Sequence, residues 1–193
     1  SKDNKDVMEG LGHIKYKDGS MYSGFVKEKN MNGKGRMVYA NGDIYQGVWV
    51  NGKANGQGVF VDKANQTIYE GEFVNDKQHG KGKEVWNNGQ SEYIGQFTEG
   101  KKTGHAKFSN DGNVYEGEFV DGKFHGRGKY YFVDTGKSYE GDFVNNEMNG
   151  KGTFWHVYGD KYEGEWKRDK AHGYGKNTHR NGATYEGDWR NDL

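Results

Sequence analysis

Residues 115–132 read YEGEFVDGKFHGRGKYYF, and this stretch decides the fold. A Tyr is followed two residues later by Gly, four residues later by an aromatic ring, and eleven and thirteen residues later by a Gly-x-Gly pair. Residues 115–120 alternate with period two, which is typical of a β-strand, and the alternation resumes after Gly126. The stretch predicts a β-hairpin whose second strand begins at the Gly-x-Gly. A polar loop joins the two strands. The equivalent loop two repeats earlier, in the repeat that starts at Tyr69, is residues 75–79.

The same unit recurs along the chain every 22 to 24 residues, with small departures at Val26 and Ala106. A fixed period of this length indicates a repeat architecture in which each unit contacts its neighbours. We expect an N-terminal tail over residues 1–9 and a repeat array over 10–193. The array comprises a half repeat at 10–21, a partial repeat at 185–193, and seven full repeats that start at Tyr22, Tyr45, Tyr69, Tyr93, Tyr115, Tyr139 and Tyr162.

The fold class follows from the breakers and turn residues. The 33 Gly residues would each cost about 1 kcal/mol inside a helix. No Pro interrupts a strand, and pairs such as Asn41-Gly42 and Asp111-Gly112 supply the positive φ values of tight hairpin turns. The sequence predicts an all-β protein: an elongated, single-layer antiparallel meander of repeated hairpins with no helices of note.

Side-chain parity assigns the two faces of this sheet. Tyr, Gly and Phe or Trp of the first strand share one face, and the intervening acids share the other. A register with Phe73 opposite Gly82, and Gly117 opposite Tyr130, would let each ring cover a glycine. On the other face acids would lie opposite bases: Glu116, Glu118, Glu140, Asp142, Glu163 and Glu165 against Lys83, Lys107, Arg127, Lys129 and Lys151.

Composition excludes several function classes. The 28 basic and 28 acidic side chains give zero net charge without like-charge runs, so no nucleic-acid footprint is present. Cys is absent, and no apolar run reaches the length of a membrane span. We expect a cytoplasmic protein that needs no cofactor.

Three stretches imitate a phosphate-binding loop by reading G-x₄-G-K. A true P-loop continues with Ser or Thr at a helix N-terminus. Here the next residues are Ala54, Lys102 and Phe124, so the pattern reflects a repeat column and a loop Gly five residues apart.

His79, His125 and His172 occupy one repeat column in alternate units. Four strands separate successive members, roughly 19 Å at standard strand spacing, whereas zinc ligands lie about 2 Å from the metal. They cannot share an ion, and we interpret them as turn residues. No catalytic constellation stands out, so the sequence predicts no metal site and no enzyme activity.

The repeat resembles the MORN (membrane occupation and recognition nexus) repeat, whose approximate pattern is Y-x-G-x-[FW]-x₂-[GND]-x₃-G-x-G. The resemblance covers the chain from Gly10 onward. It implies a curved, half-pipe meander and non-enzymatic work: protein docking, cytoskeletal or ciliary scaffolding, and phospholipid binding.

The aromatic face predicts the binding site, because the sequence encodes no second layer to cover it. We expect a concave groove that accepts a helical or extended segment of a protein partner. An alternative is that the rings lie over each other and over the glycines and only stabilise the sheet. The expected groove residues are Tyr45, Trp49, Tyr69, Phe73, Tyr93, Phe97, Tyr115, Phe119, Tyr139, Phe143, Tyr162 and Trp166.

Other functions remain open on the sequence. One is a peripheral phosphoinositide- or phospholipid-binding module with weak contact to anionic lipid. Another is the regulatory repeat region of a larger enzyme. Edge strands or grooves could also form a homodimer. Five residues interrupt the consensus and are candidates for specificity: Trp86, His105, Phe124, Trp155 and His156.

Overall fold

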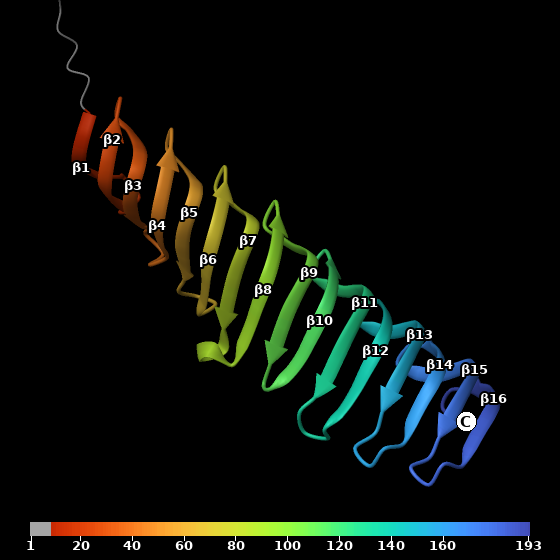
Figure 1. Cartoon of the computed structure of the whole chain (residues 1–193). Coiled ribbons are helices and arrows are strands. Elements are labelled where there is room, and N and C mark those ends of the chain that lie inside the picture. The colour runs from red at the N-terminus through yellow and green to blue at the C-terminus, as the bar shows by residue number, and fades with distance from the viewer. Residues whose placement is uncertain (1–8) are drawn as a thin grey trace, which may run out of the picture. The chain divides into compact units, whose positions relative to one another are not determined.

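The computed structural model describes residues 9–193, so most of the expected tail lies outside the described residues. These residues form sixteen β-strands in one antiparallel sheet whose strand order follows the chain (Figure 1). The all-β meander is confirmed. The strands are β1 (Glu9–Lys15), β2 (Met21–Lys27), β3 (Asn30–Val38), β4 (Ile44–Val50), β5 (Lys53–Asp62), β6 (Thr67–Val74), β7 (Lys77–Trp86), β8 (Ser91–Thr98), β9 (Lys101–Asn110), β10 (Asn113–Val120), β11 (Lys123–Phe132), β12 (Lys137–Val144), β13 (Glu147–Trp155), β14 (Lys161–Lys167), β15 (Lys170–Thr178) and β16 (Thr184–Arg190).

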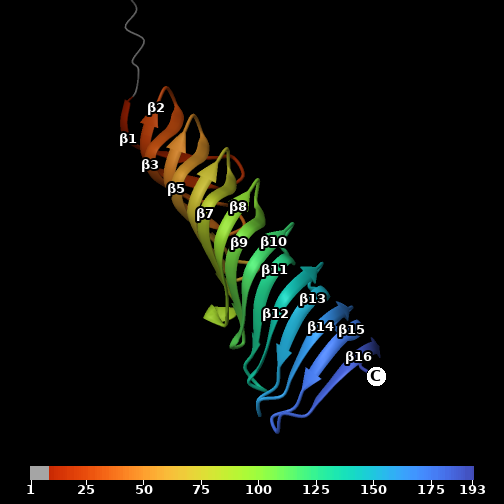
Figure 2. The same cartoon turned by 45° about the vertical axis from the view of Figure 1, so that its right-hand side comes forward.

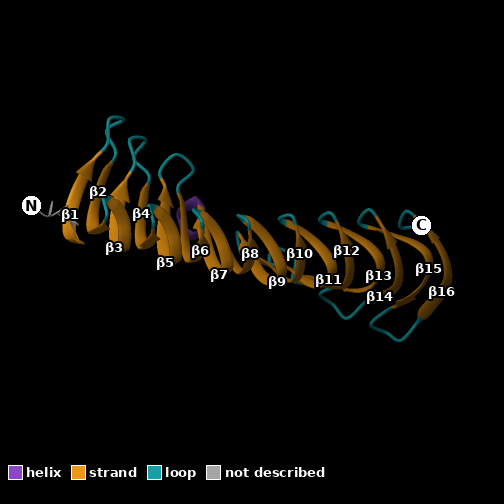
Figure 3. Ribbon diagram, turned by 90° about the horizontal axis from the view of Figure 1, so that it is seen from above, coloured by secondary structure: helices purple, strands orange, loops and turns teal. Residues whose placement is uncertain are grey.

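The chain divides into two compact units. The first reaches Gly89 and includes residues 97–100, and the second comprises 90–96 and 101–193. Within each unit consecutive strands lie side by side (Figure 2) and short loops join their ends (Figure 3). The one helical element among residues 9–193 is a three-residue 3₁₀ turn, η1 (Asn87–Gly89). No helix in this part of the chain is long and apolar enough to cross a membrane.

Each hairpin closes through a two-residue turn in which both residues have positive φ. Asn75 and Asp76 adopt φ values of 49° and 69°, and turns of this kind match the twist of the flanking strands. The expected loop over residues 75–79 is therefore wrong, because the tight turn lets β7 begin at Lys77. The other hairpin turns of this kind are Glu28-Lys29, Asn51-Gly52, Glu99-Gly100, Asp121-Gly122, Asn145-Asn146 and Arg168-Asp169. Positive φ values also occur at both residues of Asp111-Gly112, between β9 and β10, and of Asn191-Asp192, after β16.

The hairpin register differs by two residues from the expected one. Gly117 lies opposite Gly128, and Gly71 lies opposite Gly82. The ring that covers the glycine pair is the Tyr of the same strand: a Cβ on Gly128 would lie 2.5 Å from Cε2 of Tyr115. The predicted pairs of Phe73 with Gly82 and of Tyr130 with Gly117 are therefore wrong, and the repeat Tyr is the ring that lies over the glycines.

A β-bulge follows each glycine pair and gives the tyrosine hydroxyl its partner. The register shifts after Gly117, and Gly126 takes a φ of 58° on the opposite strand. Tyr115 Oη then donates a hydrogen bond to the carbonyl of Glu118 at 2.9 Å, which lies within the normal range for a hydroxyl donor. The same bond, from Tyr to the carbonyl three residues on, recurs from Tyr22, Tyr45, Tyr69, Tyr93, Tyr139, Tyr162 and Tyr185.

The core of each unit is a ladder of rings packed edge to face. Phe119 lies 5.3 Å from the ring centroid of Tyr115 and 5.0 Å from that of Tyr93, in the preceding repeat. Such pairs contribute about 0.5–1.5 kcal/mol beyond area burial. Where the ring is Trp, its indole Nε1 also donates a hydrogen bond to a carbonyl of the preceding strand. Trp166 Nε1 donates to the carbonyl of Gly152 at 3.1 Å.

Adjacent hairpins are also joined at their turns. The amide of Asp76 donates to the carbonyl of Ala54 at 3.0 Å, and the Ala54 amide donates to Asp76 Oδ1 at 2.7 Å. Asn146, Asp169 and Asp192 repeat this exchange in the second unit. Each turn is therefore held by the repeat before it.

Candidate functional site

We call the side of the sheet that carries the Tyr, Gly and Phe or Trp columns the tyrosine face, and its opposite the reverse face. The expected groove residues all lie on the tyrosine face, but they do not form an exposed strip. Their exposed fractions run from 0% at Tyr93 to 8% at Trp166. They cover each other and the glycines, so any partner on this face must contact other side chains. The residues concerned are Tyr45, Trp49, Tyr69, Phe73, Tyr93, Phe97, Tyr115, Phe119, Tyr139, Phe143, Tyr162 and Trp166.

A second tier of rings lies over this buried layer in the second unit. Phe124 stacks on Tyr115 with centroids 3.9 Å apart and planes 11° from parallel. Phe108 and Tyr130 lie 5.7 and 6.0 Å from Phe124. The tier continues through Phe132, 4.5 Å from Tyr130, to Phe154. All five rings are partly exposed.

Sequence reasoning found this tier only in part. Phe124 stood out as a departure from the consensus, because its column otherwise holds Met, Ala, Gln or Lys. Phe108, Tyr130 and Phe154 belong to the column fifteen residues after Tyr, whose apolar character is visible in the sequence. Their position above the buried ladder is not, since it depends on the register.

The tier ends at a cavity of about 350 Å³ on the tyrosine face of β12–β16. Phe154, Trp166 and Trp189 supply aromatic walls, and Met148 and Ala171 are its small or flexible apolar contacts. The remaining lining residues are polar or hydroxyl-bearing: Lys137, His156, Tyr162, Asp169, Asn177 and Asp192.

Charges of both signs line this cavity. Asp169 Oδ1 accepts from the Met148 amide and Asp192 Oδ1 from the Ala171 amide, each at 2.8 Å, so both carboxylates are held in place by the neighbouring hairpin. Burial and the nearby Lys137 lower the pKa of His156, which favours its neutral form. The cavity can therefore take an apolar side chain and bond a polar group beside it.

The first unit has a smaller set of accessible rings on its tyrosine face. Tyr39 and Phe60 are partly exposed with ring centroids 6.4 Å apart. They border a hollow of about 350 Å³ that also contacts Asp18 and Asp43. Burial, followed by the field of nearby acids, raises the pKa of Tyr39, so this phenol stays neutral.

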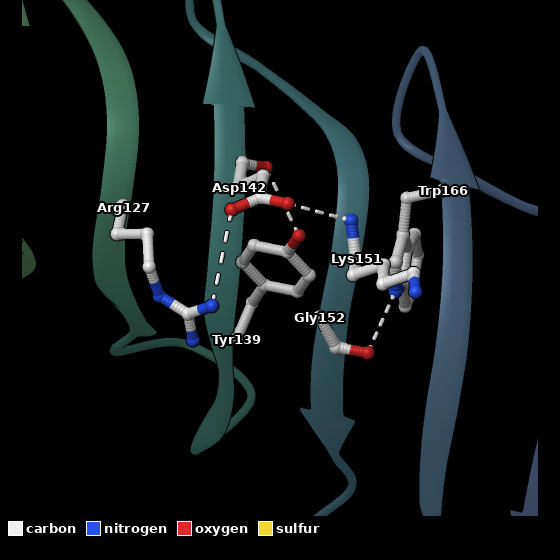
Figure 4. A network of polar contacts seen from close by, with 6 residues as sticks. All are labelled: Arg127, Tyr139, Asp142, Lys151, Gly152 and Trp166. Atoms are coloured by element: carbon white, nitrogen blue, oxygen red, sulfur yellow. Dashed lines mark hydrogen bonds and ion pairs between the residues drawn. The ribbon is translucent and has the colours of Figure 1, made fainter.

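The reverse face of the second unit carries paired charges, as predicted, except at Glu118, which lies opposite His105 and His125. Glu116 lies opposite Lys129 on one side and Lys107 on the other. Asp142 lies 4.0 Å from Arg127 Nη1 and accepts from the Lys151 amide at 2.9 Å (Figure 4). These exposed pairs contribute little, about 0–1 kcal/mol each.

The structure gives neither the apparent phosphate loops nor the histidine column the geometry of a binding site. Gly47 and Gly52 belong to β4 and the following turn, and the next element is the strand β5 rather than a helix. His79, His125 and His172 lie on β7, β11 and β15, three separate second strands of hairpins. Their interpretation as turn residues is wrong, because each two-residue turn ends before the histidine. No group of three or more His, Asp or Glu side chains within residues 9–193 could hold a metal ion.

Comparisons with known proteins identify the repeat. The sequence profile of the MORN repeat matches nine consecutive segments: 4–21, 22–44, 45–65, 69–91, 93–114, 115–137, 139–159, 162–184 and 185–193. A search of curated proteins gave no significant match.

Two solved structures that match this chain are a TCP domain and a TCP10 domain by name. The TCP domain of SAS-4 (dCPAP) from Drosophila melanogaster, in complex with a proline-rich motif of Ana2 (dSTIL), is 13% identical, with a TM-score of 0.48 and coverage of 91% of this chain and 88% of that one. The wild-type TCP10 domain of Danio rerio CPAP is 12% identical, with a TM-score of 0.34 and coverage of 92% and 94%. At these identities and TM-scores neither likeness carries an argument about function. The profile match spans nearly the whole sequence, and the chain belongs to the MORN repeat family.

Proposed function

We propose that this chain is a non-enzymatic scaffold that binds a helical or extended segment of a protein partner on its tyrosine face. The observation that carries the proposal is the second tier of partly exposed rings, Phe108, Phe124, Tyr130, Phe132 and Phe154, which ends at the cavity on β12–β16. Contiguous accessible apolar surface of this kind marks interaction sites.

The second tier is separable from the fold. The buried ladder is complete without it, and the column that holds Phe124 holds Gln78 and Lys102 in the two preceding repeats. A residue that neighbouring repeats replace with polar side chains is not required by the hairpin. The ring at Phe124 therefore supports a binding role better than a structural one.

The cavity sets the character of the contact. An apolar side chain of the partner would enter between Phe154 and Trp189, and a donor next to it would meet the free oxygens of Asp169 or Asp192. Buried aromatic anchors of this kind carry most of the binding energy at protein interfaces.

The setting of this activity rests on the family alone. A place in cytoskeletal, ciliary or membrane-associated assembly, in the cytoplasm, is the expectation that MORN repeats bring. Homodimer formation, lipid contact and a role as the regulatory region of an enzyme stay predictions, with no feature of the tyrosine face favouring them.

A random peptide library displayed on phage tests the proposal directly. Peptides selected on the immobilised chain should lose at least tenfold in affinity for Phe124→Gln, which installs the residue of a neighbouring repeat, and for Ala171→Met, which fills the cavity. Tyr131→Gln is the matched control, because Tyr131 is an exposed ring of the same strand on the reverse face. Selected peptides that bind all three variants equally, or a library that yields none, would contradict the proposal.

A further inference from the structure

The reverse face of the first unit carries a continuous row of aliphatic side chains. Each member lies directly opposite the next on the neighbouring strand, from β2 through β7. Met21 and Ile68 are 53% and 47% exposed, and the other four are partly exposed. We call this set the aliphatic row: Met21, Val38, Ile44, Val61, Ile68 and Val85.

The charges beside the β2–β5 part of the row are unbalanced. In most later repeats the residues one and three positions after Tyr are both acidic, as in Glu116 and Glu118. In the first two repeats these positions hold Ser23 and Phe25, then Gln46 and Val48. The bases of the facing strand, Lys34 and Arg36, remain and are exposed.

Among residues 9–193, no carboxylate lies directly opposite either base. Lys34 lies opposite Val48, and Arg36 lies between Ser23 and Gln46. No ion pair joins either side chain to a residue in 9–193. The nearby carboxylates have other partners: Glu9 pairs with Lys27 at 2.9 Å, Asp43 Oδ1 accepts from the Lys63 amide, and Glu70, at the β6 end of the row, lies opposite Lys83.

The spacing of the row fits a helix. Six strands at about 4.8 Å span about 24 Å, which is the length of roughly 16 helical residues. A helical stripe presents one side chain per turn, about every 5.4 Å, close to the strand spacing. Same-face side chains of an extended segment recur at about 6.6 Å and fall out of step with the row.

We propose that the aliphatic row docks an acidic amphipathic helix of a partner protein. Its apolar stripe lies along Ile44 and Val61, and carboxylates on one flank meet Arg36 and Lys34. A sheet face that is apolar is stabilised by an element packed on it. The cations lie on one flank of the row and are few, which suits a helix with one acidic edge better than an anionic vesicle surface.

The test uses a fluorescent 16-residue peptide with Leu at helical spacing and Glu along one flank, titrated with the whole chain. Ile44→Lys should raise its Kd at least tenfold. Val114→Lys, at the same column of the second unit, should leave the Kd within twofold of wild type. Arg36→Glu should weaken the acidic peptide and favour its counterpart with Lys in place of Glu. Circular dichroism checks folding, and Ile68→Lys, at an exposed position, replaces Ile44→Lys if that variant unfolds.

Several results would overturn the proposal. These are no binding by the wild-type chain, equal binding to the two lysine variants, or equal binding of the acidic and basic peptides. Retention on phosphatidylcholine–phosphatidylserine vesicles that depends on Ile44 without peptide binding would assign the row to a membrane. Light scattering that shows an Ile44-dependent dimer would assign it to a second copy.

Discussion

The reverse faces of the two units are built from the same repeat columns and differ in chemistry. On β2–β7 the column next to the loops is aliphatic throughout, and the adjoining bases Lys34 and Arg36 face no acid. In the second unit the corresponding column mixes Ser109, Val114, Tyr131 and Lys161. The adjoining bases and acids alternate from β9 to β12, as Lys107, Glu116, Lys129 and Glu140.

The tyrosine faces of the two units, by contrast, share one design. Tyr45 and Tyr139 are 1% and 0% exposed, each donates its hydroxyl to the carbonyl three residues on, and each lies over a glycine pair. The tyrosine face is constrained by folding, because it holds the buried layer of residues 9–193. The reverse face is free to vary, and its variation is where a partner can be specified.

The largest expected effect tests the design that the tyrosine faces of the two units share. Tyr45→Ala and Tyr139→Ala should each lower the free energy of unfolding by about 3–5 kcal/mol, because both remove a buried ring and its hydrogen bond. Urea unfolding of the two variants measures this. A difference of more than about twofold between them would show that the two tyrosine layers are not equivalent.

A charge reversal on the reverse face should destabilise the second unit more than a new charge destabilises the first. Glu116→Lys replaces two favourable cross-strand pairs, with Lys107 and Lys129, by two repulsions, so we expect a loss of about 1–2 kcal/mol at low salt. Gln46→Lys adds a single repulsion, with Arg36, and should cost only a few tenths. The gap should shrink in 1 M salt, since screening weakens exposed pairs. Equal losses of stability in the two variants would show that charge pairing on the reverse face does not differ between the units.

The smallest effect comes from transplanting the acid into the first unit. Gln46→Glu gives Arg36 a cross-strand partner and should stabilise the chain by about 0.2–1 kcal/mol. The same change should weaken the acidic helical peptide, because the new carboxylate competes for Arg36 and repels the ligand. A stabilised variant that still binds the peptide with wild-type affinity would uncouple the charge pattern from docking.

Much of the fold is readable from the sequence, and the exceptions have physical causes. The Tyr period, the two faces and opposed pairs such as Glu116 and Lys129 follow from spacing and parity. The register does not, because a slip of two residues keeps every side chain on its face. The two-residue turn at Asp121-Gly122, the bulge after Gly117 and the Tyr115 ring over Gly117 and Gly128 together select the observed register.

The candidate sites were less accessible to sequence reasoning. An aromatic column such as that of Tyr115, with no second layer in the sequence to cover it, predicts an exposed groove. In the structure, rings from successive repeats bury one another. The stacking of Phe124 on Tyr115 depends on the two-residue turn and bulge that follow from glycine conformation. The aliphatic row had a sequence signal, since Ile44 and Ile68 both precede the repeat Tyr, but its members meet only when the register is known.

The isoleucine methyl groups offer the most direct test of the contrast between the reverse faces. The chain has four isoleucines: Ile44 and Ile68 in the aliphatic row, Ile94 exposed on the reverse face of the second unit, and Ile14 opposite Tyr22 on the tyrosine face of β1. In a methyl NMR titration with the acidic helical peptide, we expect shifts of the Ile44 and Ile68 signals while those of Ile14 and Ile94 stay in place. Unmoved Ile44 and Ile68 signals, or equal shifts of all four, would contradict this expectation.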